Sequence, residues 1–250
     1  MAFASQTNQS IHYQAIQAED DEFSTALTLF RDRGGKGMNV TVPFKLDAYR
    51  ACTRLSGRAR MAEAVNTISI DDTGFMGDNT DGTGLVRDLE NNHDVTLAGA
   101  SILILGAGGA VRGILGPLLE QHPARITIAN RTPSRAEELV SLFPQREILE
   151  TRSYEKLENG TFDIIINGTS ASLSNTLPPL PDSLLATGTI CYDLMYADKD
   201  TVFVHWGRQK GARIAVDGLG MLVEQAAESF YIWRGIRPDT SPVIRQLRGS

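Results

Sequence analysis

Lys45 and Asp81 are the residues whose surroundings in the sequence could support acid–base chemistry. Lys45 follows the β-branched run Val40-Thr41-Val42 and Pro43, a residue favoured at the first helical position, which predicts that the lysine lies in an opening helical turn. A cation is disfavoured there by the helix dipole. Asp81 lies just before another predicted helix. A nearby carboxylate could orient the amine and tune its proton affinity, while the amine protonates a developing alkoxide. The structural alternatives are a solvated surface lysine and an aspartate that caps a helix.

A glycine-rich turn, Gly106-Ala107-Gly108-Gly109-Ala110, directly follows the apolar run Ile102-Leu103-Ile104-Leu105. When such a turn joins a strand to a helix, backbone N–H groups at the helix start can face a pyrophosphate. The third glycine of the usual G-x-G-x-x-G pattern is replaced by Val111, so the match is to a variant. The turn predicts a dinucleotide site, although a tight turn that needs glycine only for packing is the alternative.

The residues after the next predicted strand distinguish between cofactors. An NAD site would place an acid there to bind the ribose 2′-hydroxyl. This chain has Asn130-Arg131-Thr132-Pro133-Ser134-Arg135 instead, and two guanidiniums could hold a 2′-phosphate. The segment therefore favours NADP over NAD. Asn167-Gly168-Thr169-Ser170 follows another short strand, and strand ends of this kind are expected to line the ligand crevice.

The pattern along the chain predicts elements that would position these residues. In the first part we expect strands at 11–16, 38–42, 64–70 and 74–77, and helices at 22–33, 43–51 and 85–91. In the second part we expect strands at 102–105, 125–129, 164–166, 189–192 and 213–215, and helices after the glycine turn, at 134–142 and at 221–233. Strands that alternate with helices in this way indicate a doubly wound α/β domain.

Composition narrows the class of protein. A chain of 250 residues with 42% hydrophobic and 22% charged residues is typical of a globular protein large enough for two domains. A net charge of −6 argues against broad binding to nucleic acid or to anionic membranes. The two cysteines and four histidines form no metal-binding spacing, and no apolar run reaches the roughly 20 residues that span a bilayer. We therefore expect a cytoplasmic protein without a metal.

Six motifs occur in an order and spacing that resemble the shikimate dehydrogenase family. They are N-V-T-V-P-F-K (39–45), A-V-N-T (64–67), G-D-N-T-D-G (77–82), G-A-G-G-A (106–110), N-R-T-x-x-R (130–135) and D-G-L-G-M-L-V-x-Q (217–225). The resemblance covers essentially the whole chain. It implies reversible reduction of 3-dehydroshikimate to shikimate with NADP(H), a step of aromatic amino-acid biosynthesis. It leaves open whether the protein is a monomer or a homodimer.

The resemblance also implies a role for individual residues. Lys45 and Asp81 would be the catalytic pair. The residues implied to bind the substrate are Thr41, Asn66, Tyr196 and Gln225. Those implied to bind or adjoin the cofactor are Gly106, Ala107, Gly108, Gly109, Ala110, Asn130, Arg131, Thr132, Arg135, Thr169, Leu194 and Gly218.

Two domains are implied as well. Residues 1–81 and 218–250 would form a discontinuous substrate domain, and residues 82–217 a Rossmann-like NADP-binding domain. Family members begin with a strand and a loop of the form G-N-P-x-x-H-S-x-S-P, whose serines bind the substrate carboxylate, and neither occurs here. We therefore expect a truncated or wrongly started chain, or a degenerate paralogue, with a weakened substrate site and a first domain of low stability.

Two other functions remain open. A quinate/shikimate dehydrogenase of relaxed specificity is one, although such relatives often accept NAD and carry an acid where this chain has Asn130-Arg131. A non-catalytic NADP-binding paralogue is the other. The presence of both Lys45 and Asp81 argues against that paralogue.

Overall fold

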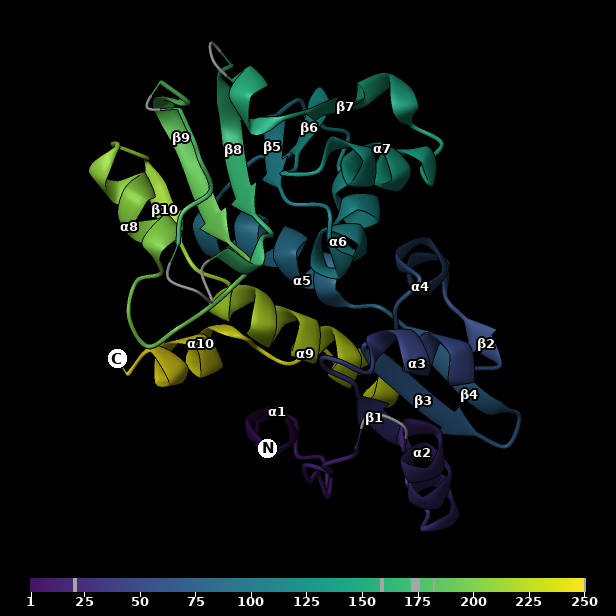
Figure 1. Cartoon of the computed structure of the whole chain (residues 1–250). Helices are drawn as coiled ribbons and strands as arrows, with labels where there is room; N and C mark the ends of the chain where they lie inside the picture. Colours follow the sequence, from purple (N-terminus) through teal and green to yellow (C-terminus); the bar gives the residue numbers. More distant parts are fainter. Residues whose placement is uncertain (20–21, 158–159, 172–175, 182, 250) are drawn as a thin grey trace.

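The computed structural model shows an α/β protein with two sheets, one in each domain (Figure 1). It describes residues 1–19, 22–157, 160–171, 176–181 and 183–249. The long helix α9 (Leu219–Arg234) runs between the two sheets, although it comes late in the sequence. No helix in the described ranges combines the length and apolar character that crossing a membrane requires.

The first sheet has the strand order β1-β3-β4-β2. Strands β3 (Thr67–Asp71) and β4 (Gly74–Asp78) confirm the predicted strands at 64–70 and 74–77 and pair as an antiparallel hairpin. Helix α2 (Phe23–Asp32) confirms the predicted helix at 22–33. The other elements here are α1 (Ala2–Gln6), β1 (Gly37–Asn39), α3 (Lys45–Ala51), β2 (Arg54–Leu55) and α4 (Gly57–Ala62). Buried apolar side chains from α2, α3 and the strands form a small core, with Phe23, Leu27, Ala48, Val65 and Ile68 among them.

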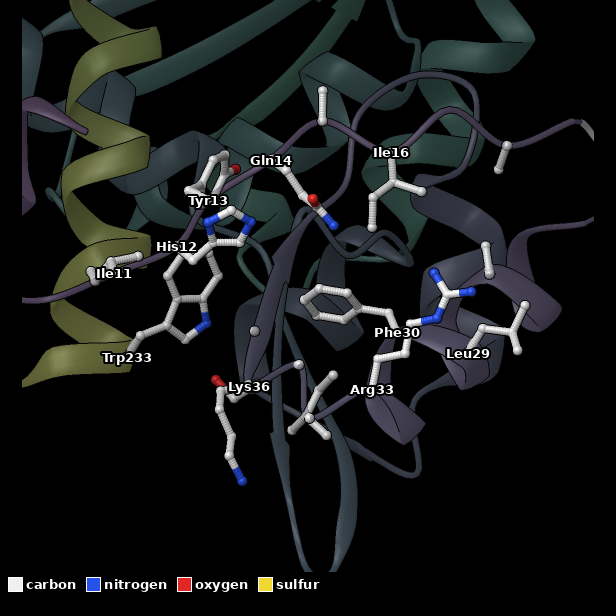
Figure 2. Close-up of a pocket in the computed structure, with 18 of the residues that line it drawn as sticks. Ile11, His12, Tyr13, Gln14, Ile16, Leu29, Phe30, Arg33, Lys36 and Trp233 are labelled. Carbon is white, nitrogen blue, oxygen red and sulfur yellow. The ribbon is translucent and has the colours of Figure 1, made fainter.

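The outer edge of β1 faces a cavity rather than another strand. Met38 lies opposite Ile68, and Val40 N–H donates to the Asn66 carbonyl, so alternation along the ladder turns the backbone N–H and C=O groups of Gly37 and Asn39 away from β3. A cavity of about 1210 Å³ separates this edge from residues 10–18 (Figure 2). The Trp233 indole of α9 borders the same cavity.

The predicted strand at 11–16 is therefore wrong. Backbone groups of residues 10–18 form no hydrogen bond with any described residue, and the nearest free sheet edge lies across the cavity. A strand needs a ladder partner within hydrogen-bonding distance. The Tyr13 hydroxyl, which donates to Oδ1 of Asn39 at 2.8 Å, bridges this gap through a side chain instead.

The segment before Lys45 also differs from expectation. Strand β1 ends at Asn39, whereas the predicted strand continued to residue 42. Phe44 N–H donates to the Thr41 carbonyl and closes a turn around Val42 and Pro43, so α3 begins at Lys45 and not at the proline. The lysine still lies in the first helical turn.

The second sheet is parallel, with the order β10-β9-β8-β5-β6-β7. Numbered within this domain, that order is 6-5-4-1-2-3, the arrangement of a doubly wound dinucleotide-binding fold. The structure confirms the predicted strands as β5 (Ser101–Leu105), β6 (Arg125–Ala129), β8 (Phe162–Asn167), β9 (Leu185–Asp193) and β10 (Ile214–Val216). The edge strand β7 (Leu149–Arg152), the 3₁₀ turns Arg146–Ile148 and Tyr154–Leu157, and α8 (Val202–Gln209) were not predicted.

Helices cover both faces of this sheet and bury its apolar strands (Figure 1). Helix α6 (Gly109–Leu119) opens at the glycine-rich turn and contains Pro117, and α7 (Pro133–Ser141) follows the arginine segment. Both lie close to their predicted positions. Strand β5 is buried on both faces, which agrees with its uninterrupted apolar sequence.

The two sheets are joined through α5 (Asp81–Arg87), a π-helical turn (Asp88–Asn92) and α9, after which α10 (Ser241–Arg248) ends the described chain. Helix α5 begins four residues before the predicted helix at 85–91. Arg58 forms ion pairs with Asp78 at 2.7 Å and with Glu228 of α9 at 3.2 Å. Burial opposes the charge on Arg58, but hydrogen bonds and attraction from the two carboxylates outweigh it and raise the pKa of the guanidinium. This network fixes α9 against the first sheet.

Candidate active site

Lys45 and Asp81 come together at the starts of two helices. The Lys45 Nζ lies 2.6 Å from Oδ2 of Asp81, and their side chains are 30% and 13% exposed. Each residue opens a helix, α3 and α5 respectively. The dipole of α5 favours the carboxylate, whereas the dipole of α3 disfavours the ammonium. The carboxylate thus compensates a cation that would otherwise be poorly placed.

Asn66 holds the other oxygen of this carboxylate. Its Nδ2 has two protons and three acceptors in range, Oδ1 of Asp81 at 2.8 Å, Oγ1 of Thr80 at 2.9 Å and Oε1 of Gln225 at 3.2 Å. The Asn66 side chain is only 3% exposed. Both oxygens of Asp81 are therefore fixed by donors, which leaves the Lys45 ammonium as the group that can face a ligand.

These residues line a cavity of about 920 Å³ that is bordered by both domains. Met195, Met221 and Leu222 give it an apolar wall. The predicted residues that line it are Thr41, Lys45, Asn66, Asp81, Ala110, Leu194, Tyr196, Gly218 and Gln225. Tyr196 is half exposed, and the structure shows it on the cavity wall without a hydrogen bond to another described residue.

The predicted cofactor residues Gly106 to Ala110 form the turn after β5 and the first two positions of α6. Gly106 has φ +101°, and a Cβ there would come within 3.0 Å of the Gly168 carbonyl oxygen, so this position requires glycine. A Cβ built at Gly108 or Gly109 would meet no atom within 4 Å. The backbone at the start of α6 is therefore open to a ligand, and α6 presents its unpaired N–H groups there.

The second group of predicted cofactor residues lies at the end of β6. Asn130 Nδ2 donates to the Thr132 carbonyl at 2.8 Å, which shapes the loop before α7. Arg131 and Arg135 are exposed and form no ion pair with a described residue. Two unpaired guanidiniums beside an open glycine turn fit a dinucleotide that carries an additional phosphate.

Two further predicted positions lie beyond the carboxyl ends of the parallel strands, beside the point between β5 and β8 where the strand order reverses. Thr169 Oγ1 donates to Oδ1 of Asn167 at 2.7 Å, which orders the turn after β8. Gly218 lies against Leu194, because a Cβ at this glycine would lie 2.5 Å from the Leu194 carbonyl oxygen. Ligands of open α/β sheets bind at such a switch point.

Several residues at this site were not predicted. Thr80 and Ser229 are fully buried beside Asn66, while Met195, Met221 and Leu222 line the cavity. Thr80, Met221 and Leu222 lie within the sequence motifs of the family, which could have identified them. Ser229 lies one helical turn after Gln225, and only that spacing pointed to it. Within the described ranges, no group of three or more His, Cys, Asp and Glu side chains could hold a metal.

Comparison with known proteins supplies the family. Residues 1–68 match the sequence model of the shikimate dehydrogenase substrate binding domain, residues 88–176 that of shikimate/quinate 5-dehydrogenase, and residues 218–248 that of the shikimate 5′-dehydrogenase C-terminal domain. The NADP(+)-dependent shikimate dehydrogenase of Alkalilimnicola ehrlichii is 54% identical over 246 residues, which are 98% of this chain and 91% of that protein.

The chain belongs to the shikimate dehydrogenase family. This finding confirms the resemblance predicted from the six motifs. Among solved structures, the Ael1 enzyme of Pseudomonas putida matches with a TM-score of 0.93 and 46% identity, covering 98% of this chain and 90% of that one. Shikimate 5-dehydrogenase from Thermus thermophilus, solved with NADP(H) and shikimate, matches with a TM-score of 0.87 and 29% identity, covering 99% and 92%. The two-domain α/β fold is thus that of the shikimate dehydrogenase family.

Proposed function

We propose that this chain catalyses the reversible, NADPH-dependent reduction of 3-dehydroshikimate to shikimate. The observation that carries the proposal is the Lys45–Asp81 pair, 2.6 Å apart, on the wall of a cavity that both domains border. A relative that is 54% identical over nearly the whole chain bears the name of this enzyme. A small keto acid with several hydroxyls matches the short polar side chains that surround the pair.

Each of these site residues would have a separate role in the reaction. When bound, NADPH supplies a hydride to the keto carbon. The Lys45 ammonium donates a proton to the oxygen of that carbonyl, and Asp81 keeps the ammonium oriented. Asn66 fixes the carboxylate from the opposite side. In oxidation of shikimate the same lysine, as the neutral amine, accepts the hydroxyl proton.

Four polar side chains are proposed to hold the substrate: Thr41, Asn66, Tyr196 and Gln225. All of them line the cavity that contains Lys45. The Nε2 of Gln225 donates a hydrogen bond to the Leu222 carbonyl, and its Oε1 lies near Asn66 and Thr80. These contacts hold the Gln225 side chain in one orientation on α9. Fixed hydrogen-bonding groups favour one orientation of a polyhydroxylated ring.

NADP(H) is the proposed cofactor. The turn Gly106 to Ala110 would bind the pyrophosphate through backbone N–H groups, with Thr169, Leu194 and Gly218 along the nicotinamide side of the crevice. Asn130, Arg131, Thr132 and Arg135 would bind the adenosine end. The two arginines are exposed and unpaired among the described residues, which supports a role with the 2′-phosphate.

The proposed domain boundaries follow from the position of α9. Residues 1–81 and 218–250 would form the substrate domain, because α9 carries Gln225 back to the first sheet. Residues 82–217 would form the NADP-binding domain. A cytoplasmic location is supported by the two free thiols, Cys52 and Cys191. We propose that the protein has no nucleic-acid partner. We propose that it is a monomer or a homodimer.

The test is an absorbance assay of NADP⁺ reduction by the purified chain, with shikimate and quinate as substrates and NAD⁺ as the alternative cofactor. The proposal predicts turnover of shikimate with NADP⁺ and much weaker turnover with NAD⁺. Comparable rates on quinate would support a dehydrogenase of relaxed specificity. NADP⁺ binding in a titration without any turnover would overturn the proposal in favour of a cofactor-binding protein.

A further inference from the structure

Ser229 lies on α9 one turn beyond Gln225 and is completely buried. Its Oγ accepts a hydrogen bond from Nδ2 of Asn39 at 3.0 Å. The same oxygen lies 2.7 Å from Oγ1 of Thr67 and 3.4 Å from Oγ1 of Thr80. The Ser229 hydroxyl can also donate to the Gln225 carbonyl oxygen, which lies 3.0 Å away. A buried hydroxyl with several hydrogen-bond partners can link their side chains into one network, so that the orientation of one side chain depends on that of the next.

The orientation that matters is that of the Asn66 carboxamide. Its Oδ1 accepts the Thr80 backbone N–H at 2.9 Å and the Thr67 hydroxyl at 2.9 Å. Because a backbone N–H can only donate, the atom facing it must be the oxygen, and Nδ2 therefore faces Asp81. A flipped carboxamide would turn an oxygen toward the carboxylate and repel it.

Counting hydroxyl protons shows what Ser229 adds. Thr67 has one hydroxyl proton and three oxygens in range, Oδ1 of Asn66 at 2.9 Å, Oγ of Ser229 at 2.7 Å and, more distant, Oγ1 of Thr80 at 3.5 Å. When Thr67 donates to Asn66, its 2.7 Å contact with Ser229 is a hydrogen bond only if Ser229 supplies the proton between the two hydroxyls. Ser229 has one hydroxyl proton and two strong acceptors for it, Oγ1 of Thr67 at 2.7 Å and the Gln225 carbonyl at 3.0 Å. The shorter contact favours Thr67, because the Gln225 carbonyl lies inside α9 and already accepts a helical N–H.

We propose that Ser229 is a positioning residue of the active site. It donates to Thr67, Thr67 donates to Asn66, and Asn66 presents its Nδ2 to Asp81, the partner of Lys45. The proposal rests on the proposed function, because the position of Asp81 matters for turnover only if the Lys45–Asp81 pair performs the proton transfer. Neither the family resemblance nor the comparisons assign a role to Ser229.

The test compares Ser229→Ala with Thr127→Val, measuring kcat, KM for shikimate and the Kd for NADP⁺. Thr127 is a matched control, because its buried hydroxyl has no hydrogen-bond partner within the described structure. We expect Ser229→Ala to lower kcat about tenfold while KM and Kd change less than about threefold, as loss of one neutral hydrogen bond would. Thr127→Val should leave all three constants near those of the unmodified chain. An unchanged kcat in Ser229→Ala would overturn the proposal.

A double-mutant cycle with Thr67→Val separates positioning from simple stabilisation. If Ser229 acts through Thr67, Ser229→Ala should cause no further loss of kcat in the Thr67→Val background. Losses that multiply would show that the two hydroxyls act independently and would overturn the proposal.

A readout that does not need turnover distinguishes failure of this proposal from failure of the proposed function. In ¹H–¹⁵N spectra, the Asn66 carboxamide signals should shift in Ser229→Ala and stay in place in Thr127→Val. If the unmodified chain fails to oxidise shikimate, the proposed function falls, and these spectra still decide whether Ser229 orients Asn66. Unmoved Asn66 signals would overturn the positioning role.

Discussion

Gly84 of α5 lies directly against Gln225 of α9. A Cβ built at this glycine would come within 2.8 Å of the backbone nitrogen and the Cβ of Gln225, and within 2.8 Å of the Met221 carbonyl oxygen. Because α5 and α9 pack this closely, Asp81 of α5 and the Gln225 amide of α9 line the same cavity. The separation of these two helices therefore sets the width of the candidate site.

Gly84→Ala should widen this junction and displace Gln225. Backbone atoms block the added methyl group, so the helices must move apart, at a cost of about 1–3 kcal/mol in the free energy of unfolding. We expect the KM for shikimate to rise about tenfold, with a smaller change in the Kd for NADP⁺. Urea unfolding and steady-state kinetics measure the two effects.

Gly57→Ala provides the control for Gly84→Ala. Gly57 is the first residue of α4, and a Cβ there would meet no atom within 4 Å. The substitution should leave both KM and stability close to those of the unmodified chain. If the two variants behaved alike, the packing account of Gly84 would be wrong.

Arg131→Ala and Arg135→Ala should each weaken NADP⁺ binding without weakening NAD⁺ binding. A charge-assisted hydrogen bond to a phosphate contributes about 1.5–3 kcal/mol, which corresponds to a rise in Kd of roughly 10- to 100-fold. Titration calorimetry with both dinucleotides measures the difference. Arg33→Ala, an exposed arginine after α2, should change neither constant. Equal losses for NADP⁺ and NAD⁺ would contradict a role with the 2′-phosphate.

The second sheet could be predicted because each of its central strands carries its own signal. Strand β5 is a continuous apolar run that ends at a glycine turn, and both features arise from local backbone and burial requirements. The strand at residues 11–16 could not be judged in this way, because its formation depends on a partner across the cavity. Edge strand β7 was missed for a related reason, since its sequence Leu149-Glu150-Thr151-Arg152 is apolar at only one position.

The candidate site was predicted by residue type and order, but its connections were not. The convergence of Lys45 and Asp81 follows from motifs that adjoin two helix starts. The contact between Thr67 and Ser229 joins residues 162 positions apart, and no local sequence pattern predicts it. Hydrogen-bond networks of this kind depend on how α9 packs on the first sheet, which only the assembled structure determines.

Hydrogen exchange should reveal the open edge of the first sheet. We expect the amide protons of Gly37 and Asn39 to exchange rapidly, because both N–H groups point away from β3, and that of Met38, within the β1–β3 ladder, to exchange more slowly. Amides of β5 and β8, central in the second sheet, should be slowest of all. Equal protection of the three β1 amides would mean that the edge has a partner in solution.

The two thiols should react slowly in the folded protein. Burial raises the pKa of Cys52 to about 11 and that of Cys191 to about 12. At pH 8 a thiolate-dependent reagent should modify both far more slowly than in the unfolded chain, with Cys191 the slower. Because the folded pKa values lie above the unfolded value of about 9, the unfolded chain loses protons first, and stability should fall as the pH rises from 9 toward 12. Rapid modification of Cys191 at pH 8 would contradict this packing.

The Lys45 amine, held by Asp81, is proposed to carry the proton that the reaction transfers. The most direct measurement is the kcat of Lys45→Ala for shikimate oxidation, alongside its Kd for NADP⁺ and the same constants for Lys36→Ala, an exposed lysine before β1. Lys45→Ala should lose turnover by about 100-fold to 10,000-fold while its Kd for NADP⁺ stays near that of the unmodified chain. Lys36→Ala should keep both its turnover and its Kd for NADP⁺. A Lys45→Ala variant that retained turnover within a few-fold of the unmodified chain would contradict this role of Lys45.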